Sequence, residues 1–139
     1  PQDVLHDAQN PYAALDADTL LQALAKTRLT RAPGAQFEYS NFAAMLLSYA
    51  VARRSGEDFE TLLRTRLFAP LGMAHAYIGD RPDGVRAAQG HLPNAQPTPA
   101  WTFGENLAGV GGVRATLDDM VRYVQGQMGA APQPLLASL

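Results

Sequence analysis

The sequence predicts a mainly α fold with one short β-hairpin. Four stretches repeat apolar residues at helical spacing, and three of them follow side chains that can cap a helix N-terminus. One long segment, from Gly72 to Gly112, is instead crowded with glycine and proline. The length of 139 residues fits one domain, so we expect residues 1–139 to form a single helical lobe.

The first predicted helix covers about residues 17–29. Asp16 or Asp18 can cap its N-terminus, and Pro33-Gly34 stops the chain from continuing as helix. Helical spacing predicts one apolar stripe, which consists of Leu20, Leu21, Leu24 and Ala25.

The second predicted helix covers about residues 42–54, with the sequence FAAMLLSYAVARR. Because it is apolar almost all round, we expect it to lie centrally in the core. Ser40 or Asn41 can cap its N-terminus, and Gly56 can end it. Arg53 and Arg54 favour the negative end of its dipole.

Two further helices are predicted on either side of the glycine- and proline-rich segment. The third covers about residues 58–68, with Pro70 beyond its end and an apolar face of Phe59, Leu62, Leu63 and Leu67. The fourth follows Thr116, which can cap it, and Asp118 and Asp119 carry charge that suits a first turn. Its spacing predicts a buried face made of Leu117, Met120, Val121, Val124 and Met128.

The segment between these two helices is predicted to be loop, with a short hairpin that pairs Ala76–Ile78 with Ala87–His91. Some forty residues with little regular structure are unusual inside a compact domain. The segment therefore lines a functional cleft or leans on protein outside this chain. Trp101 and Phe103 lie in it, and they either border a cleft or pack onto the helices.

The composition argues against several classes of site. Cysteine is absent, which removes disulfides, thiol nucleophiles and cysteine zinc sites. Three separated histidines predict no metal site, and Gly109, Gly111 and Gly112 do not form a nucleotide-binding motif, so we expect no cofactor. A net charge of −2 with scattered basic residues argues against a nucleic-acid partner. No apolar run approaches the ~20 residues of a membrane span, and no targeting segment is visible.

The segment with chemical potential lies at the start of the second helix, where residues 33–41 read PGAQFEYSN. A turn here presents Tyr39, Ser40 and Asn41 beside the free N–H groups and positive dipole of a helix N-terminus. Polar side chains on such a corner can point into a cleft. In the alternative interpretation Tyr39 packs, while Ser40 and Asn41 only cap the helix.

Three further motifs follow this segment in order: LFAPLGM at 67–73, AAQGH at 87–91 and GVGGVRATLDDMVRY at 109–123. The succession resembles the serine β-lactamase-like family, which includes class C β-lactamases, D-alanyl-D-alanine carboxypeptidases and related esterases. The resemblance covers about residues 17–126. It implies that the chain is the helical lobe of a two-lobed α/β serine hydrolase, which cleaves amide, β-lactam or ester bonds through an acyl-serine intermediate.

The resemblance also implies roles for the corner residues. Tyr39 is the catalytic tyrosine, Asn41 hydrogen-bonds the amide or carbonyl of the substrate, and Ser40 holds the loop in shape. The substrate is a small molecule or a peptide. The family implies a periplasmic or secreted enzyme, although its esterases also include cytoplasmic ones.

The two other motif groups of the family have no match in the sequence. The only lysine, Lys26, has Ala23 where Ser-x-x-Lys requires serine, and Thr27 is followed by Arg28 where Lys-Thr-Gly requires glycine. No histidine begins His-x-Gly. A free tyrosine titrates near pH ~10, so it needs nearby ammonium groups to act as a base at neutral pH.

We therefore expect the chain to be an internal fragment that is inactive alone, although the intact parent is an enzyme. Its helices should expose an apolar face that normally covers the missing lobe, and through which the chain self-associates. The alternative is a non-catalytic helical interaction or structural module that shares the family scaffold, because function lies in sites rather than in folds.

Overall fold

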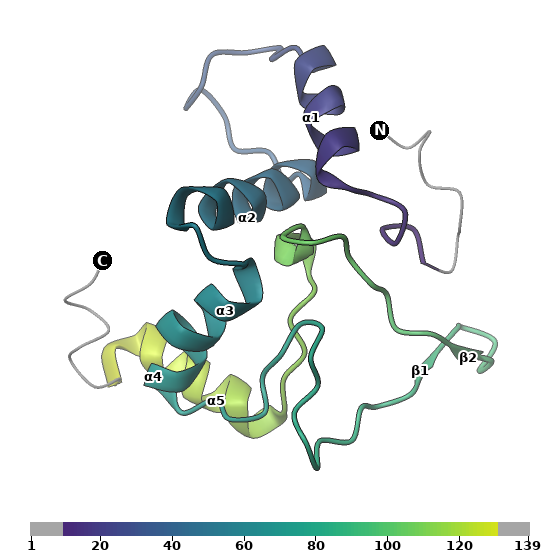
Figure 1. The fold of residues 1–139 in the computed structure, drawn as a ribbon, viewed down its shortest axis with the longest axis vertical. Coiled ribbons are helices and arrows are strands. Elements are labelled where there is room, and N and C mark those ends of the chain that lie inside the picture. The colour runs from purple at the N-terminus through teal and green to yellow at the C-terminus, as the bar shows by residue number, and fades with distance from the viewer. Residues whose placement is uncertain (1–9, 131–139) are drawn as a thin grey trace.

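The computed structural model describes residues 10–130 and shows a mainly helical chain with one short antiparallel sheet, which confirms the predicted fold class (Figure 1). The sheet pairs β1 (Gly90–His91) with β2 (Pro97–Thr98). None of the helices in this range is long and apolar enough to cross a membrane. The α-helices are α1 (Ala17–Lys26), α2 (Asn41–Ser55), α3 (Phe59–Leu63), α4 (Ala69–Leu71) and α5 (Leu117–Gln125).

The first two helices begin at predicted caps. The Asp16 carboxylate accepts from the Thr19 N–H at 2.8 Å at the start of α1, and Ser40 caps α2. α1 ends at Lys26, three residues before the predicted end, because Thr27 is extended and donates its hydroxyl back to a carbonyl of the helix. α2 ends at Ser55 and is followed by the cap residue Gly56, whose φ of 75° suits glycine.

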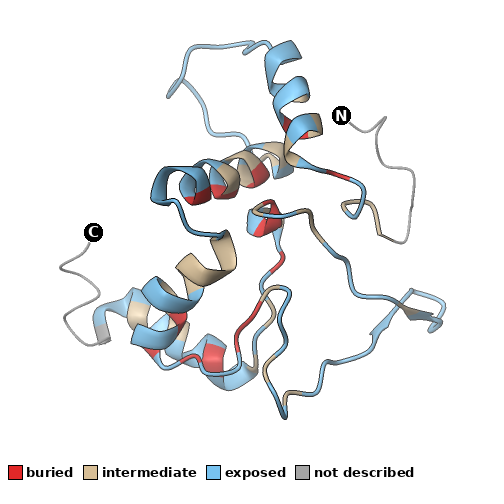
Figure 2. Ribbon diagram, in the orientation of Figure 1, coloured by how far each residue is buried: buried red, intermediate tan, exposed pale blue. Residues whose placement is uncertain are grey.

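One side of α2 is buried and the other faces solvent, so the expectation that it lies centrally in the core is wrong for half of its surface (Figure 2). Leu47 and Val51 are 65% and 43% exposed. The buried strip carries Met45, which packs into a first core cluster with Leu15, Leu20 and Leu107.

Ser48 joins the buried strip of α2 to the loop before α5. Its hydroxyl donates to the Asn106 carbonyl at 2.8 Å and accepts from the Gly109 N–H at 3.2 Å. Gly109 lies in a 3-10 turn, Ala108–Val110, so close to α2 that a Cβ there would lie 2.6 Å from the carbonyl oxygen of Ala44. The sequence therefore needs glycine at this crossing.

The third helical stretch is longer than predicted and contains Pro70. A π-helical turn, Arg64–Phe68, joins α3 to α4. In this turn the Ala69 N–H bonds to the Arg64 carbonyl. Pro70 lies in α4 directly after this turn, where the change of hydrogen-bond spacing accommodates a residue that has no N–H. The stretch ends at Gly72, whose φ is 71°.

The predicted buried face of α5 is exposed, which corrects that expectation. Leu117 is 83% exposed, and Met120, Val121, Val124 and Met128 are also exposed. The side that faces the protein carries Asp119, which is 1% exposed, and Tyr123, which packs on a second core cluster. That cluster consists of Phe68, Leu71, Met73 and Ala76.

The predicted hairpin partners are also wrong. Tyr77 pairs with Arg114 in an isolated antiparallel bridge instead of pairing with the segment near His91. His91 pairs with Pro97 in the observed hairpin. Arg114 stabilises the bridge in two ways. Its backbone exchanges hydrogen bonds of 2.8 and 2.9 Å with Tyr77, and its guanidinium lies over the tyrosine ring.

The buried carboxylate of Asp119 should make the stability of the chain depend on acid pH. Burial alone would raise the pKa of Asp119, but the Thr116 N–H and hydroxyl, at 3.0 and 2.8 Å, and the His75 N–H hold this pKa below its ordinary value. The folded pKa is therefore below the unfolded one. The stabilisation exists above the unfolded pKa and is lost as the pH falls through the folded pKa.

We expect the free energy of unfolding of the wild type to fall below about pH 4, and to fall less steeply in Asp119→Asn. Urea unfolding between neutral pH and pH 3 measures this. Asp118→Asn removes an exposed carboxylate from the same turn and should change stability at pH 7 by less than about 0.5 kcal/mol. Parallel pH curves for the wild type and Asp119→Asn would contradict the assignment.

Candidate active site

The candidate site is the corner at the N-terminus of α2. The turn at Pro33-Gly34, with a φ of 81° at Gly34, leads into a stretch without regular structure that ends at the helix. Tyr39 is 74% exposed and directly precedes the cap. Its phenol is therefore accessible and anchored by a helix of 15 residues.

Ser40 is the helix cap, as one of the predicted alternatives required. Its backbone is extended, with φ −147° and ψ 117°, and its hydroxyl accepts from the Ala43 N–H at 3.2 Å. This bond satisfies a free donor of the first turn and fixes the direction in which the chain enters the helix. Ser40 thus has a structural contact within α2.

Asn41 is the first residue of α2, and its side chain bonds outside the helix. The Nδ2 atom donates to the Tyr12 hydroxyl at 2.9 Å. The structure therefore brings a residue from before α1 to the corner. Tyr12 was not among the residues singled out from the sequence, because no motif or spacing relates it to Asn41, 29 positions later.

Tyr12 belongs to an aromatic group that includes Trp101 and Phe103 of the long loop, residues 72–112. Its ring stacks on Phe103, with centroids 5.5 Å apart, and meets Trp101 edge-on at 5.4 Å. Trp101 keeps 47% of its surface exposed. Trp101 and Phe103 therefore pack against Tyr12 in the segment before α1, and Tyr12 links them to Asn41. The sequence did not identify Tyr12 as their partner.

Arg114 fixes the long loop near its two ends. The guanidinium donates to the carbonyl of Ile78 and, at 2.6 Å, to the carbonyl of Trp101. Together with the backbone bridge to Tyr77, these bonds join two parts of the loop, residues 77–78 and Trp101, to Arg114. The position of Trp101 beside Tyr12 therefore depends on a residue just before α5.

The corner has groups for proton transfer and for hydrogen bonding. Within residues 10–130 the Tyr39 hydroxyl makes no hydrogen bond, and Asn41 keeps its Oδ1 acceptor and one N–H free. A charged pair, Arg31 and Glu38, lies in the same loop. No cluster of three metal-ligating side chains occurs in this range; His6 lies outside the described residues.

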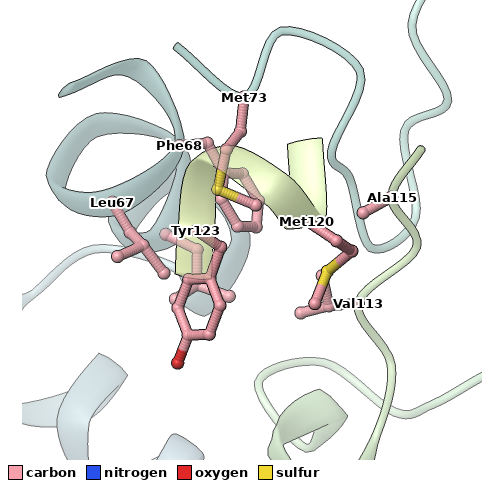
Figure 3. A pocket seen from close by; sticks show the side chains of 8 residues that line it. Leu67, Phe68, Met73, Val113, Ala115, Met120 and Tyr123 are labelled. Atoms are coloured by element: carbon pink, nitrogen blue, oxygen red, sulfur yellow. The ribbon is translucent and has the colours of Figure 1, made fainter. Parts of the chain in front are cut away.

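A pocket of about 460 Å³ lies away from this corner, between the α3 stretch and α5 (Figure 3). Its walls are apolar except for Tyr123, and none of them comes from α2 or the corner. It is the open side of the second core cluster, because Phe68 and Met73 belong to both. Its lining is Leu63, Leu67, Phe68, Met73, Val113, Ala115, Met120 and Tyr123.

Comparisons with known proteins agree on one family. The Beta-lactamase family model matches residues 2–138. The D-alanyl-D-alanine-carboxypeptidase/endopeptidase AmpH of Escherichia coli is 36% identical over 104 residues, which cover 73% of this chain and 26% of that protein. A beta-lactamase of Yersinia enterocolitica is 30% identical over 122 residues, which cover 86% of this chain and 31% of that protein.

A solved structure gives the same result in three dimensions. The D-alanine carboxypeptidase AmpC of Burkholderia cenocepacia superposes with a TM-score of 0.73 at 34% identity, over 91% of this chain and 37% of that one. The chain thus spans between 26% and 37% of the length of these relatives. With the family model matching nearly its whole length, this chain belongs to the β-lactamase family.

Proposed function

We propose that this chain is the helical lobe of a larger serine hydrolase, which cleaves amide, β-lactam or ester bonds through an acyl-serine intermediate. The observation that carries the proposal is the geometry of the corner: an accessible Tyr39 next to a capped helix start, with Asn41 one residue further on. The relatives named as carboxypeptidases and β-lactamases support the reaction class. Their names also support a small-molecule or peptide substrate.

In this proposal each corner residue has one task. A serine from the other lobe attacks the substrate carbonyl, and its proton passes to a base group that includes the Tyr39 phenol oxygen. The same phenol then returns a proton to the leaving nitrogen or oxygen as the carbonyl re-forms. Asn41 donates or accepts a hydrogen bond that positions the substrate, and Ser40 keeps the corner in place.

The chain alone should not turn over substrate, because Tyr39 lacks the serine and the lysine ammonium groups that this mechanism requires. We expect purified residues 1–139 to hydrolyse a chromogenic cephalosporin and a nitrophenyl ester at the rate of buffer. The longer protein that supplies Ser-x-x-Lys is the matched control. An acyl adduct in the mass spectrum of the chain alone would contradict the mechanism.

We also propose that the exposed face of α5 leads the chain to self-associate. Leu117, Val121 and Val124 are all at least 46% exposed, although apolar side chains of this size gain from leaving water. Light scattering of concentrated chain should show dimers or larger species, and Val121→Lys with Val124→Lys should reduce them. A monomer at every concentration would contradict this proposal and would weaken the alternative function of a helical interaction module.

The site of action follows from the proposed substrates. We propose that the parent enzyme is periplasmic or secreted. A bacterial relative is named as a D-alanyl-D-alanine-carboxypeptidase/endopeptidase, and family members that act on cell-wall peptides work outside the cytoplasmic membrane. Fractionation of cells that express the full-length protein tests this, and recovery in the cytoplasmic fraction would contradict it.

A further inference from the structure

We propose that Tyr12 is a positioning residue whose hydroxyl holds the carboxamide of Asn41 in the orientation in which it meets the substrate. The inference rests on the proposed function, because it deepens the role that Asn41 has there. It starts from the hydrogen bond of 2.9 Å from Asn41 Nδ2 to the Tyr12 hydroxyl. Tyr12 comes from the segment before α1, so the corner is built from two distant parts of the chain.

The hydrogen bond joins the Nδ2 side of the amide to Tyr12. A carboxamide has an acceptor on one side and two N–H donors on the other, and an exposed one can turn over between the two orientations. With one Nδ2 hydrogen engaged by Tyr12, the Oδ1 atom and the second hydrogen remain for the substrate and its surroundings. An amide that is already oriented loses less freedom when the substrate binds.

Tyr12 can orient another side chain because it is itself held on several sides. Asn10 and Thr102 exchange two hydrogen bonds of 2.9 Å, which fasten this segment to the long loop. The ring then packs on Phe103 and Trp101. Tyr12 also contacts the first core cluster, and its backbone carbonyl accepts from the Leu15 N–H at 3.2 Å. The hydroxyl therefore stays in one place without help from Asn41.

The substitution Tyr12→Phe isolates the hydroxyl, since it keeps the ring and its stacking. In the full-length enzyme we expect kcat/KM to fall about tenfold, while the melting temperature changes little. The 15N-detected side-chain amide resonances of Asn41 should also move. Tyr49→Phe is the matched control, because Tyr49 is also half-buried against the first core but bonds Arg53 on α2. It should leave kcat/KM and the Asn41 resonances unchanged.

A double-mutant cycle then separates positioning from general packing. If Tyr12 acts through Asn41, Tyr12→Phe should cost nothing further in an Asn41→Ala background, whereas a packing role would lower activity equally in both. Wild-type kcat/KM in Tyr12→Phe, in an enzyme that Tyr39→Phe inactivates, would overturn the positioning role and leave the proposed function standing. A full-length protein with no turnover would overturn the proposed function and the positioning role with it, even if the Asn41 resonances still moved.

Discussion

Replacing Tyr39 by phenylalanine in the full-length enzyme should lower kcat by about two to four orders of magnitude, which is the usual contribution of a positioned proton-transfer group. The substitution removes one hydroxyl from a side chain that is 74% exposed, so the stability of the fold should hardly change. Steady-state kinetics with a chromogenic ester and a thermal melt of the same sample measure both quantities. Because the phenol acts in the chemical step, we expect the loss in kcat rather than in KM.

Tyr123→Phe is the control for this experiment. Tyr123 lies on α5 at the edge of the apolar pocket, and its ring packs on the second core cluster rather than at the corner. Its hydroxyl should be dispensable for turnover. Full activity of Tyr39→Phe would remove Tyr39 from the mechanism, and a large loss of melting temperature in that variant would point to a packing role instead.

Replacing Gly109 by alanine should destabilise the chain by about 3 kcal/mol and lower its melting temperature by on the order of 10 °C. The added Cβ would lie 2.6 Å from the Ala44 carbonyl oxygen and 2.7 Å from the Cβ of Ser48. Both are near-immobile parts of α2, so the 3-10 turn must move away from the helix. That movement would also break the Gly109 N–H bond to the Ser48 hydroxyl.

Gly79→Ala is the matched control, because a Cβ there makes only an ordinary contact of 3.4 Å with the carboxylate of Glu60 and the backbone needs no positive φ. Its stability should stay within about 0.5 kcal/mol of the wild type. Denaturant unfolding of both variants decides the matter. Equal stability of the two alanine variants would show that the crossing of the turn over α2 is looser than the structure has it.

The helix starts could be predicted from the sequence because a cap is a local interaction. Asp16, Ser40 and Thr116 each bond an N–H three residues later, so a short stretch of sequence contains the whole interaction. Pro70 was harder. Its place inside a helical stretch depends on the π-helical turn before it, and no residue pattern in that turn announced a change of hydrogen-bond spacing.

The orientation of α5 and the pairing of the loop could not be predicted, because they depend on distant partners. Spacing predicted that the apolar residues of α5 share one face of the helix. That face lies in solvent, because the opposite face, with Asp119 and Tyr123, packs against the protein. Tyr77 has its partner Arg114 more than thirty residues away, across a loop whose length the local pattern does not constrain.

The candidate site shows the same division between local and distant. The corner of Tyr39, Ser40 and Asn41 is contiguous, so the motif and its place before a helix could be predicted together. Tyr12 is different. A single tyrosine near Asn10 looks like any half-buried aromatic residue, and only the folded chain brings its hydroxyl to Asn41.

Arg114 anchors the long loop at two points. Its guanidinium bonds the carbonyls of Ile78 and Trp101, so the loop formed by residues 79–100 begins and ends at the same side chain. Insertions, deletions or substitutions between these two anchors, the hairpin included, should therefore leave Trp101 in place. Arg114 thus separates a part of the loop that tolerates changes of sequence and length, residues 79–100, from the fixed position of Trp101.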